Sequence, residues 1–583
     1  MAEKAKEKKE ISKKPEETKE TETKVSGKKT AGTKASSKKK AAAGKTGTST
    51  KRKTASRSRS TASGKTTKKP SARKTAEKKA SQKSEKPAET KLTAEVIAPD
   101  TKKTEEKAAP KEAKLKVLFA TSECVPFAST GGLGEVAGSL PAALVNSGVD
   151  CRVIMPLYEK VPQSVRDKMV FMGTGTVPVA WRRQYLGLFE MKQNNVTYYF
   201  VDNEYYFKRA GLYGYYDDGE RFSYFSRAVF EAMEIAGFYP DIIHCNDWQT
   251  ALVPVFQNSL VRREYLKTVF TIHNIEYQGQ YSTDALDSII GLPNSENHVL
   301  EYGDCINLMK GGLECANAIT TVSPTYAREI FDPANSFGLE PIISKNGGKI
   351  SGIVNGINTQ LYDPAKDPYT AAHYSSSDLS GKYECRRALQ SAVGLPEKDV
   401  PVITMISRLV PPKGIDLVME IMDSLLASRD IQFIILGTGE SHYEDFFRGL
   451  QECHQDKVRA LIQFNAPLSH MVYAGGSILL VPSRSEPCGL TQMIGCRYGN
   501  IPVVRQTGGL ADTITDCTLG DGSGFVFSQF TGEDLYNGVT NALDRWYQRD
   551  DWEALMKHDM DLDFSWNASA AEYLKLYKQV ISE

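Results

Sequence analysis

Short apolar, β-rich segments alternate with glycine turns and helical patterns through most of this chain. The first segment spans residues 114–123, and Gly131, Gly132 and Gly134 then break the chain before a helical stretch that leads to a second apolar segment at 151–156. A strand, a glycine turn, a helix and a second strand form the βαβ unit of a doubly wound sheet. The alternation therefore predicts an α/β fold built on parallel sheets.

The alternation occurs as two consecutive series. Further strands are expected at 196–202, 241–246, 267–273, 318–323 and 350–356, and the pattern restarts with strands at 400–409, 432–437, 461–465, 478–483 and 501–504. At roughly 100–200 residues per domain, this part of the chain is too long for one core. We expect two Rossmann-like domains that face each other across a cleft, at 114–355 and 356–583. A final helix near 568–582 is free to pack back on the first domain.

The residues before this folded part have a different composition. Residues 1–114 carry 35 Lys and Arg against 15 Asp and Glu, whereas residues 115–583 carry 38 against 56. The first segment has no aromatic residue and is rich in Lys, Ala, Ser and Thr, so it cannot bury enough apolar surface to offset the entropy of ordering. We expect a disordered basic tail at 1–113, which is either a solvated extension or a polyanion-binding arm.

Cysteine usage and targeting signals favour a cytoplasmic enzyme. All ten cysteines follow residue 114 without a CxxC pair, which is typical of reduced thiols and argues against a disulfide scaffold or a zinc module. The chain shows no apolar signal-peptide core and no long uncharged apolar stretch, so secretion and membrane insertion are not expected.

Residues 482–513 contain the densest set of candidate site residues. An apolar strand at 478–483 precedes Glu486, and the following residues, Cys488 to Thr491, lead into an expected helix. In open α/β sheets, ligands bind at the carboxyl ends of the strands, and the N–H groups of a helix start can face an anion. The stretch predicts a sugar-phosphate pocket, in which Glu486 either binds sugar hydroxyls or caps the helix.

Other candidates also follow expected strands. Arg408 and Lys413 come just after the first strand of the second series, where two cations could neutralise a diphosphate; alternatively they form a solvated surface pair. Asp247 and His273 end two adjacent strands and would point toward the same cleft, although a single histidine of this kind is more often structural. Tyr213 belongs to a tyrosine cluster that could stack on sugar rings or pack in the core.

Eight motifs in order resemble those of bacterial glycogen synthases and plant starch synthases, which are retaining glycosyltransferases of the GT-B fold. The resemblance covers about residues 114–583. The motifs are STGGLGEVAGSLP, HCNDWQT, FTIHNIEYQG, VSPTYAREI, VNGIN, SRLVPPKG, SRSEPCGLTQ and RYGNIPVVRQTGGLADT. The resemblance implies transfer of glucose from a nucleotide-glucose, usually ADP-glucose, to the non-reducing end of an α-1,4-glucan. It implies retention of configuration, no cofactor and no metal requirement.

The resemblance also implies roles for individual residues. Arg408 and Lys413 would bind the diphosphate, Glu486 would hold the donor glucose, and His273 would lie beside it. The remaining donor-binding positions would be Gly131, Gly132, Gly134, Asn355, Phe464, Cys488, Gly489, Leu490 and Thr491, with Phe464 at the nucleobase. Sugar or acceptor contacts are expected at Ser129, Glu135, Asp247 and Tyr213.

The chain departs from the family pattern at several positions. Ser129 stands where the family's first motif has a lysine, and Glu135 replaces the usual aspartate. Asn246 and Gln249 stand where many members have histidines. Ile494, eight residues after Glu486, replaces a second glutamate found in other retaining GT-B enzymes, which is typical of the starch synthase branch. The loss of the lysine predicts either reduced turnover or compensation by another group.

Two alternatives to the glucan synthase hypothesis remain open. One is a GT-B transferase that uses UDP-glucose or another acceptor. The other is a glucan-binding relative that keeps the pocket but has reduced turnover.

Overall fold

The computed structural model describes residues 114–583. The basic tail predicted for residues 1–113 lies outside the described residues. Among the helices that are described, none is long and apolar enough to cross a membrane. All ten cysteines lie in the described part of the chain, and all are free thiols.

The first domain is built on a nine-stranded sheet with the order β12-β11-β7-β6-β1-β2-β5-β4-β3. Its strands are β1 (Lys116–Ala120), β2 (Asp150–Pro156), β3 (Val170–Val179), β4 (Arg182–Gln193), β5 (Val196–Asp202), β6 (Ile242–Asn246), β7 (Lys267–Ile272), β11 (Ala318–Thr321) and β12 (Ile350–Gly352). The strands from β12 to β5 pair in parallel, whereas β4 and β3 form an antiparallel hairpin at one edge. A separate small sheet contains β8 (Gln280–Tyr281), β10 (Cys305–Asn307) and β9 (Glu301–Tyr302).

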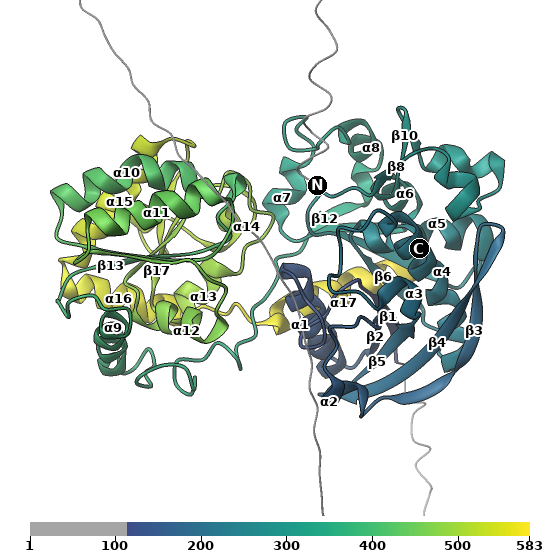
Figure 1. The fold of residues 1–583 in the computed structure, drawn as a ribbon, viewed down its shortest axis with the longest axis horizontal. Coiled ribbons are helices and arrows are strands. Elements are labelled where there is room, and N and C mark those ends of the chain that lie inside the picture. The colour runs from purple at the N-terminus through teal and green to yellow at the C-terminus, as the bar shows by residue number, and fades with distance from the viewer. Residues whose placement is uncertain (1–113) are drawn as a thin grey trace, which may run out of the picture. The chain divides into compact units, whose positions relative to one another are not determined.

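Helices pack against this sheet (Figure 1). They are α1 (Gly132–Asn146), α2 (Gln163–Arg166), α3 (Glu204–Phe207), α4 (Asp218–Ala236), α5 (Leu252–Phe256), α6 (Leu308–Cys315), α7 (Pro324–Glu329) and α8 (Glu340–Lys345). The central strands are rich in apolar residues, and β6 is buried at every position. Burial on both faces is what a parallel sheet with helical crossovers requires, and it explains why these strands were recognisable in the sequence.

The second domain is built on a six-stranded parallel sheet with the order β15-β14-β13-β16-β17-β18. Its strands are β13 (Val402–Ile406), β14 (Gln432–Leu436), β15 (Val458–Leu461), β16 (Ile478–Val481), β17 (Ile501–Arg505) and β18 (Phe525–Phe527). Its helices are α9 (Ser380–Ala392), α10 (Ile415–Ser428), α11 (Ser441–Cys453), α12 (Ala466–Gly475), α13 (Thr491–Arg497), α14 (Gly508–Thr513), α15 (Gly532–Trp546) and α16 (Arg549–Met560). Figure 1 shows these helices on both faces of the sheet. The predicted α/β fold with two Rossmann-like sheets is confirmed.

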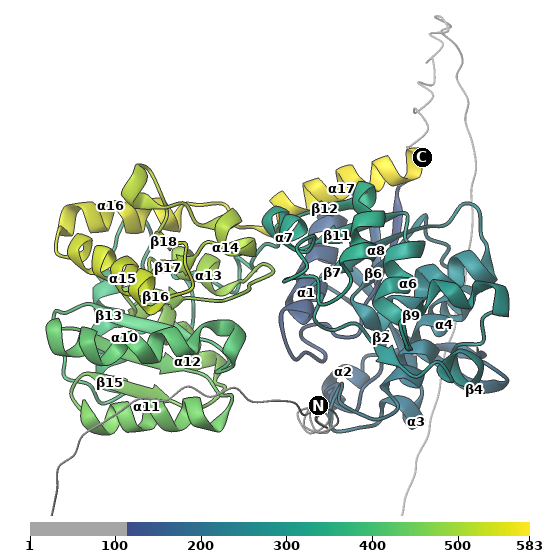
Figure 2. The same cartoon turned by 90° about the horizontal axis from the view of Figure 1, so that it is seen from above.

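The last helix, α17 (Trp566–Ser582), returns to the first domain (Figure 2). It packs against α1. Its buried aromatic residues, Trp566, Tyr573 and Tyr577, belong to the first hydrophobic core. The Tyr577 hydroxyl lies 2.6 Å from Nδ1 of His244 in β6, so the helix is also tied to the centre of the sheet by a buried hydrogen bond.

One predicted strand is displaced, and the strands β3, β4, β8, β9, β10 and β18 were not predicted. The strand expected at 461–465 runs from Val458 to Leu461, because Asn465 instead caps α12 by accepting a hydrogen bond from the Leu468 N–H. The β3–β4 hairpin was not predicted, since its alternating glycine, threonine and apolar residues do not form a continuous apolar run.

Candidate active site

The carboxyl ends of β13 and β16 form one cavity in the second domain. These strands are hydrogen-bonded neighbours, with Ile403 opposite Ile478. The cavity has a volume of about 130 Å³. Its lining includes Arg408 and Lys413, which follow β13, and Ser483, Glu486 and Thr491, which follow β16. The structure thus brings together side chains that the sequence placed at the ends of two separate strands.

Lys413 and Glu486 form an ion pair in this cavity. The Lys413 ammonium donates a 2.5 Å hydrogen bond to Oε2 of Glu486, and the Ser483 hydroxyl donates to the same oxygen at 3.0 Å. The Glu486 side chain is only 10% exposed. A carboxylate with so little water contact depends on its donors, so removal of Lys413 would leave the buried charge without an opposite charge and with only the Ser483 hydroxyl as donor.

Arg408 presents its positive charge to solvent. Its side chain is exposed, and its guanidinium forms no ion pair or hydrogen bond with any residue of the described range 114–583. The cavity therefore combines one uncompensated cation with one cation that is paired to a carboxylate. A planar guanidinium beside an ammonium is suited to bind the oxygens of a diphosphate.

The two glycine turns of residues 482–513 shape the loop that carries Glu486. Gly489 adopts a φ of +73°, which favours glycine. A Cβ at Gly508 would lie 2.0 Å from the Glu486 carbonyl oxygen, and the Gly509 N–H donates to that oxygen at 3.0 Å. Only residues without a side chain allow α14 to approach the backbone of the loop so closely. These glycines therefore serve close packing around Glu486.

Two helices, one from each domain, cap one another beside this loop. At the start of α7, the Thr325 N–H donates to Oδ2 of Asp512 at 2.7 Å and the Thr325 hydroxyl donates to Oδ1. In return, the Gly508 N–H and the Thr507 hydroxyl both donate to Oε1 of Glu329 at 3.0 Å. Carboxylates at helix N-termini are stabilising because they satisfy free N–H groups. The reciprocal contact holds the Glu486 loop from the side of the first domain.

Sequence reasoning missed this reciprocal contact. Glu329 and Asp512 lie inside quoted motifs, but their partners are far away in the chain, and neither spacing nor periodicity indicates such a pairing. Ser323 adds a third contact, since its hydroxyl donates to the Pro487 carbonyl at 2.7 Å.

His273 and Asp247 meet at the ends of β7 and β6 in the first domain. The backbone N–H of His273 donates to Oδ1 of Asp247 at 2.7 Å, and Nε2 of His273 lies 2.9 Å from Oδ1 of Asn246. The Asn246 amide nitrogen donates to the carbonyl of Ala120 at 3.0 Å, which fixes the amide orientation. Because the Oδ1 atom of Asn246 can only accept a hydrogen bond, Nε2 of His273 carries the proton. The Nδ1 atom of His273 is then free to accept a hydrogen bond.

Loss of water contact shifts the pKa values of this pair in opposite directions. Burial lowers the pKa of His273 to about 3, so the imidazole is neutral and a weak base near pH 7. Burial raises the pKa of Asp247 to about 7, against the opposing effect of the N–H donors of His273 and Asn274. Asp247 also has a φ of +55°, an unusual backbone conformation for a residue other than glycine. Strain and a shifted pKa at one residue are typical of a functional site.

We expect the Asp247→Asn variant to gain stability relative to the wild type as the pH rises from 5 to 8. The folded-state pKa of Asp247 lies above its unfolded value, so ionisation costs stability once the pH exceeds the unfolded pKa, and the full cost is present above pH 7. Asparagine keeps the Oδ1 acceptor and does not ionise. Thermal unfolding at pH 5, 6, 7 and 8 measures the difference, which should not exceed about 4 kcal/mol. A constant difference across this range would contradict the assignment.

The glycines predicted to form a turn before a helix instead lie at the start of α1: Gly131 is its N-cap, and Gly132 and Gly134 belong to its first turn. A Cβ at Gly131 or Gly132 would meet no atom within 4 Å, so these two glycines face open space. A Cβ at Gly134 would lie 2.2 Å from the Ser129 hydroxyl, so Gly134 is required for packing. The Ser129 hydroxyl donates to the Gly131 carbonyl at 3.3 Å. Burial raises the pKa of Glu135.

Glu123 was not predicted as a site residue, although it lies three residues after the end of β1. Its carboxylate accepts hydrogen bonds from the N–H and the hydroxyl of Thr130 in the glycine turn. The neighbouring Ser122 hydroxyl is 2.7 Å from the hydroxyl of Tyr213, which places Tyr213 beside this turn. Burial raises the pKa of Glu123. An acid at the carboxyl end of a central strand was the available signal in the sequence.

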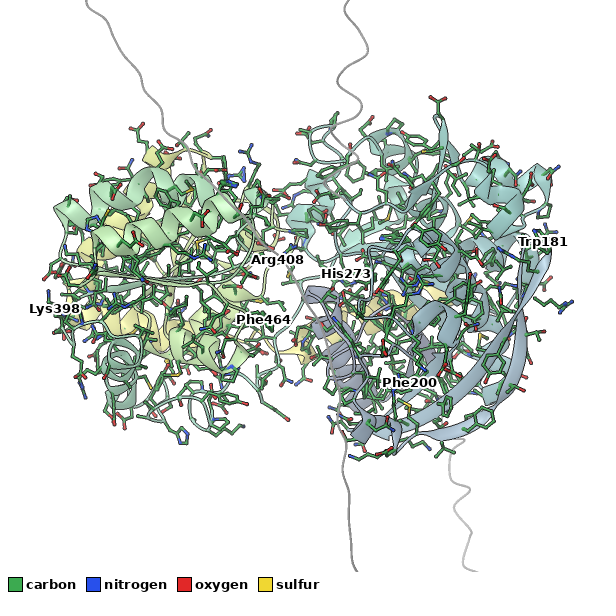
Figure 3. All side chains as sticks on the ribbon, viewed as in Figure 1. Trp181, Phe200, His273, Lys398, Arg408 and Phe464 are labelled. Atoms are coloured by element: carbon green, nitrogen blue, oxygen red, sulfur yellow. The ribbon has the colours of Figure 1, made fainter. Side chains whose placement is uncertain are left out.

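The remaining predicted residues do not line the 130 Å³ cavity. Phe464 is 93% exposed in the loop after β15, and Figure 3 labels it together with Arg408 and His273. Asn355 and Cys488 are buried, and the Asn355 Oδ1 has no hydrogen-bond partner in the described part of the chain. Burial raises the pKa of the Cys488 thiol to about 12. Gly489 and Leu490 lie between Cys488 and the start of α13.

Comparison with known proteins agrees with the fold and with the motifs. Residues 116–345 match the starch synthase catalytic domain, and residues 386–557 match glycosyl transferases group 1. The glycogen synthase of Bacillus subtilis (strain 168) is 45% identical over 479 residues, which cover 80% of this chain and 98% of that protein. The glycogen synthase of Anoxybacillus flavithermus (strain DSM 21510 / WK1) is 44% identical over 482 residues, with the same shares covered.

Comparison with solved structures also matches this chain to a starch synthase. The catalytic domain of starch synthase IV from Arabidopsis thaliana, bound to ADP and acarbose, superposes with a TM-score of 0.75 and 33% identity. The match covers 81% of this chain and all of that one. A sucrose-phosphate synthase from Thermosynechococcus elongatus, at 17% identity and a TM-score of 0.52 over 80% of this chain, shares the fold alone. The chain therefore belongs to the glycogen synthase and starch synthase family of GT-B glycosyltransferases.

Proposed function

We propose that the enzyme transfers glucose from ADP-glucose to the non-reducing end of an α-1,4-glucan, with retention of configuration. The observation that carries this proposal is the cavity between the ends of β13 and β16, where Arg408, Lys413 and Glu486 meet. The ADP and the sugar analogue acarbose bound by the Arabidopsis relative support an adenine nucleotide donor and a glucan acceptor.

In this mechanism, Arg408 and Lys413 bind the donor diphosphate. Negative charge develops on the leaving ADP as the glycosidic bond breaks, and two fixed cations stabilise that charge more in the transition state than in the ground state. Lys413 is paired with Glu486 in the structure. The diphosphate would therefore share Lys413 with Glu486, while Arg408 is available without breaking any contact.

Glu486 holds the hydroxyls of the donor glucose. Asn355, His273, Cys488, Gly489, Leu490 and Thr491 complete the donor subsite, Gly131, Gly132 and Gly134 approach the phosphates, and Phe464 contacts the nucleobase. On the first-domain side, Ser129, Glu135, Asp247 and Tyr213 contact sugar or acceptor. Because Nε2 of His273 donates to Asn246, its Nδ1 is left to accept a hydrogen bond from a sugar hydroxyl.

We propose front-side displacement as the route to retention. The cavity contains Glu486 but no second carboxylate of the retaining-glycosidase kind. Since the pKa of His273 is near 3, its imidazole is a poor proton acceptor at neutral pH. The departing phosphate oxygen then takes the proton of the acceptor hydroxyl as the new glycosidic bond forms.

A donor panel with a glycogen primer tests the proposal. We expect a higher kcat/KM for ADP-glucose than for UDP-glucose, and an unchanged rate in the presence of EDTA, because no step uses a metal. A preference for UDP-glucose would favour the alternative GT-B transferase. Loss of activity in EDTA would show that the enzyme requires a metal ion, and that the cations of the cavity alone do not neutralise the diphosphate.

For the basic tail, we propose binding to a polyanion such as nucleic acid. Residues 25–73 contain many Lys and Arg and no Asp or Glu, which supports an electrostatic interaction. Binding of full-length protein to DNA should weaken steeply with salt, since each phosphate contact releases a counterion. Equal affinities of the full-length chain and of a variant without residues 1–113, both at low salt, would rule this out.

We also propose that the enzyme is cytoplasmic. Ten free thiols, of which several are buried in the two cores, are suited to a reducing compartment.

A further inference from the structure

The β3–β4 hairpin at the edge of the first sheet has two different faces. Its inner face is apolar and buried, with Val177, Val179, Leu186 and Leu188 among the core residues, and β3 packs on α4. Its outer face is formed by residues of the opposite register, in which Thr176 pairs with Tyr185 and Thr174 with Gly187. This outer face has no part in the site described above.

The outer face carries exposed aromatic rings. Tyr185 is 48% exposed and Phe171 is 53% exposed, and the Phe171 ring lies 5.3 Å from that of Phe189. A Cβ at Gly187 would lie 2.5 Å from the Tyr185 hydroxyl oxygen and 3.2 Å from Cζ, so the Tyr185 ring lies across the glycine, flat on the sheet. The threonines between the rings, Thr174 and Thr176, are exposed as well.

The backbone under these rings is held in place. The carbonyl oxygen of Tyr185 accepts hydrogen bonds from the Asn203 amide at 2.8 Å and from the Tyr224 hydroxyl at 2.7 Å. Tyr224 belongs to α4 and Asn203 follows β5, so two neighbouring elements fix this point of the hairpin. A fixed aromatic surface loses little conformational entropy when it binds a ligand.

The tip of the hairpin presents a tryptophan. Trp181 is 81% exposed and lies at the outer edge of the first domain (Figure 3). Behind it, the Arg182 guanidinium donates to the Ser288 carbonyl at 3.0 Å and pairs with Glu220 at 3.1 Å. The preceding Ala180 has a φ of +48°. The turn has a strained backbone and exposes a large aromatic side chain, and neither feature stabilises the fold. Together they point to a binding role.

We propose that the outer face of this hairpin, defined by Phe171, Trp181, Tyr185 and Phe189, binds an α-glucan chain outside the active site. Pyranose rings present apolar C–H faces that stack on flat aromatic rings, and their hydroxyls pair with short polar side chains such as Thr174 and Thr176. The ten residues of β3 include no charged side chain, which fits a neutral polymer. On β4, the exposed Arg183 lies opposite Pro178 on this face, and its guanidinium can donate hydrogen bonds to sugar hydroxyls. This inference rests on the glucan acceptor proposed above.

The hairpin is a poor template for pairing with a second copy of the chain. Pro178 in the edge strand β3 has no N–H to donate, and the register of β3 against β4 shifts between Phe171 and Gly173. Both features interrupt the regular row of backbone groups that strand addition needs. The aromatic rings also lie on the face of the hairpin and not along its edge. A long glucan bound at this face and at the active site would gain affinity through two attachments to one molecule.

Tryptophan fluorescence of the full-length protein offers a direct test. Four of the five tryptophans are less than 10% exposed, so Trp181 is the one that solvent reaches. We expect glycogen and β-cyclodextrin to shift its emission to shorter wavelength in the wild type. The shift should disappear in Trp181→Phe.

Affinity electrophoresis and kinetics with two acceptors complete the test. The double variant Trp181→Ala/Tyr185→Ala should bind glycogen about 30-fold more weakly, since each ring contributes on the order of 1 kcal/mol of stacking. The rate of glucose transfer to maltotriose should stay at the wild-type value. Tyr547→Ala, which removes a tyrosine that is 52% exposed in the second domain, is the matched control and should change neither quantity.

Three outcomes would overturn the proposal. They are unchanged glycogen affinity in the double variant, a parallel loss of rate with maltotriose and glycogen, and a dimer in solution that the double variant converts to a monomer. Failure of the wild type to extend maltotriose would instead contradict the proposed function, so the two failures are distinguishable.

Discussion

Replacement of Arg408 or Lys413 by alanine is expected to reduce kcat for glucose transfer by about 100- to 1,000-fold, the usual cost of losing one preorganised charge partner in a transition state. Both cations lie in the cavity at the ends of β13 and β16, where charge on the departing diphosphate would develop. Steady-state rates with ADP-glucose and glycogen measure the loss. Lys398→Ala is the matched control, because Lys398 is an exposed lysine far from Arg408 in the same domain (Figure 3).

The two alanine variants should differ in stability. Arg408 makes no ion pair or hydrogen bond through its guanidinium with residues 114–583, so Arg408→Ala should unfold at the wild-type temperature. Lys413→Ala leaves the Glu486 carboxylate, which is 10% exposed, with only the Ser483 hydroxyl as donor. An unfolding free energy lower by about 1–3 kcal/mol is expected. Wild-type activity in either variant would contradict the proposal that the donor diphosphate binds in this cavity.

Glu486→Gln is expected to separate sugar binding from diphosphate binding. Glutamine keeps the size of the side chain but removes the charge that pairs with Lys413. We expect kcat to fall by about 100-fold or more, because hydrogen bonds from sugar hydroxyls to a charged acceptor are stronger than those to an amide.

The affinity for ADP should respond differently in this variant. Lys413 no longer pairs with a carboxylate, so its full charge is available to the diphosphate, and calorimetric titration should show ADP binding as tight as in the wild type or tighter. Loss of ADP affinity together with activity would mean that Glu486 supports the whole cavity and does not specifically hold glucose.

Most of the parallel strands were predictable because they are largely buried and rich in apolar residues. The segment at 196–202, for example, coincides with β5, from Val196 to Asp202. The hairpin of β3 and β4 escaped prediction because one of its faces is exposed, so glycines and threonines interrupt its apolar pattern. The strand expected at 461–465 was displaced because Asn465 takes the N-cap of α12.

The candidate site was predictable where its residues follow strands. Arg408, Lys413 and Glu486 could be placed at one edge because the carboxyl ends of parallel strands meet there. The ion pair of Lys413 with Glu486 and the reciprocal capping of α7 and α14 could not be predicted, because they depend on how side chains distant in sequence are oriented. The neutral state of His273 likewise follows from burial, which a sequence pattern does not contain.

The most direct test is a balance of ADP released against glucose incorporated, with labelled ADP-glucose, a glycogen primer and the full-length enzyme. We predict one ADP for each glucose added and complete release of the label by an enzyme that cleaves α-1,4 bonds. The replacement of the family lysine by Ser129 should not change this ratio. ADP release without growth of the glucan, or glycogen binding without any ADP release, would contradict the proposed transfer reaction.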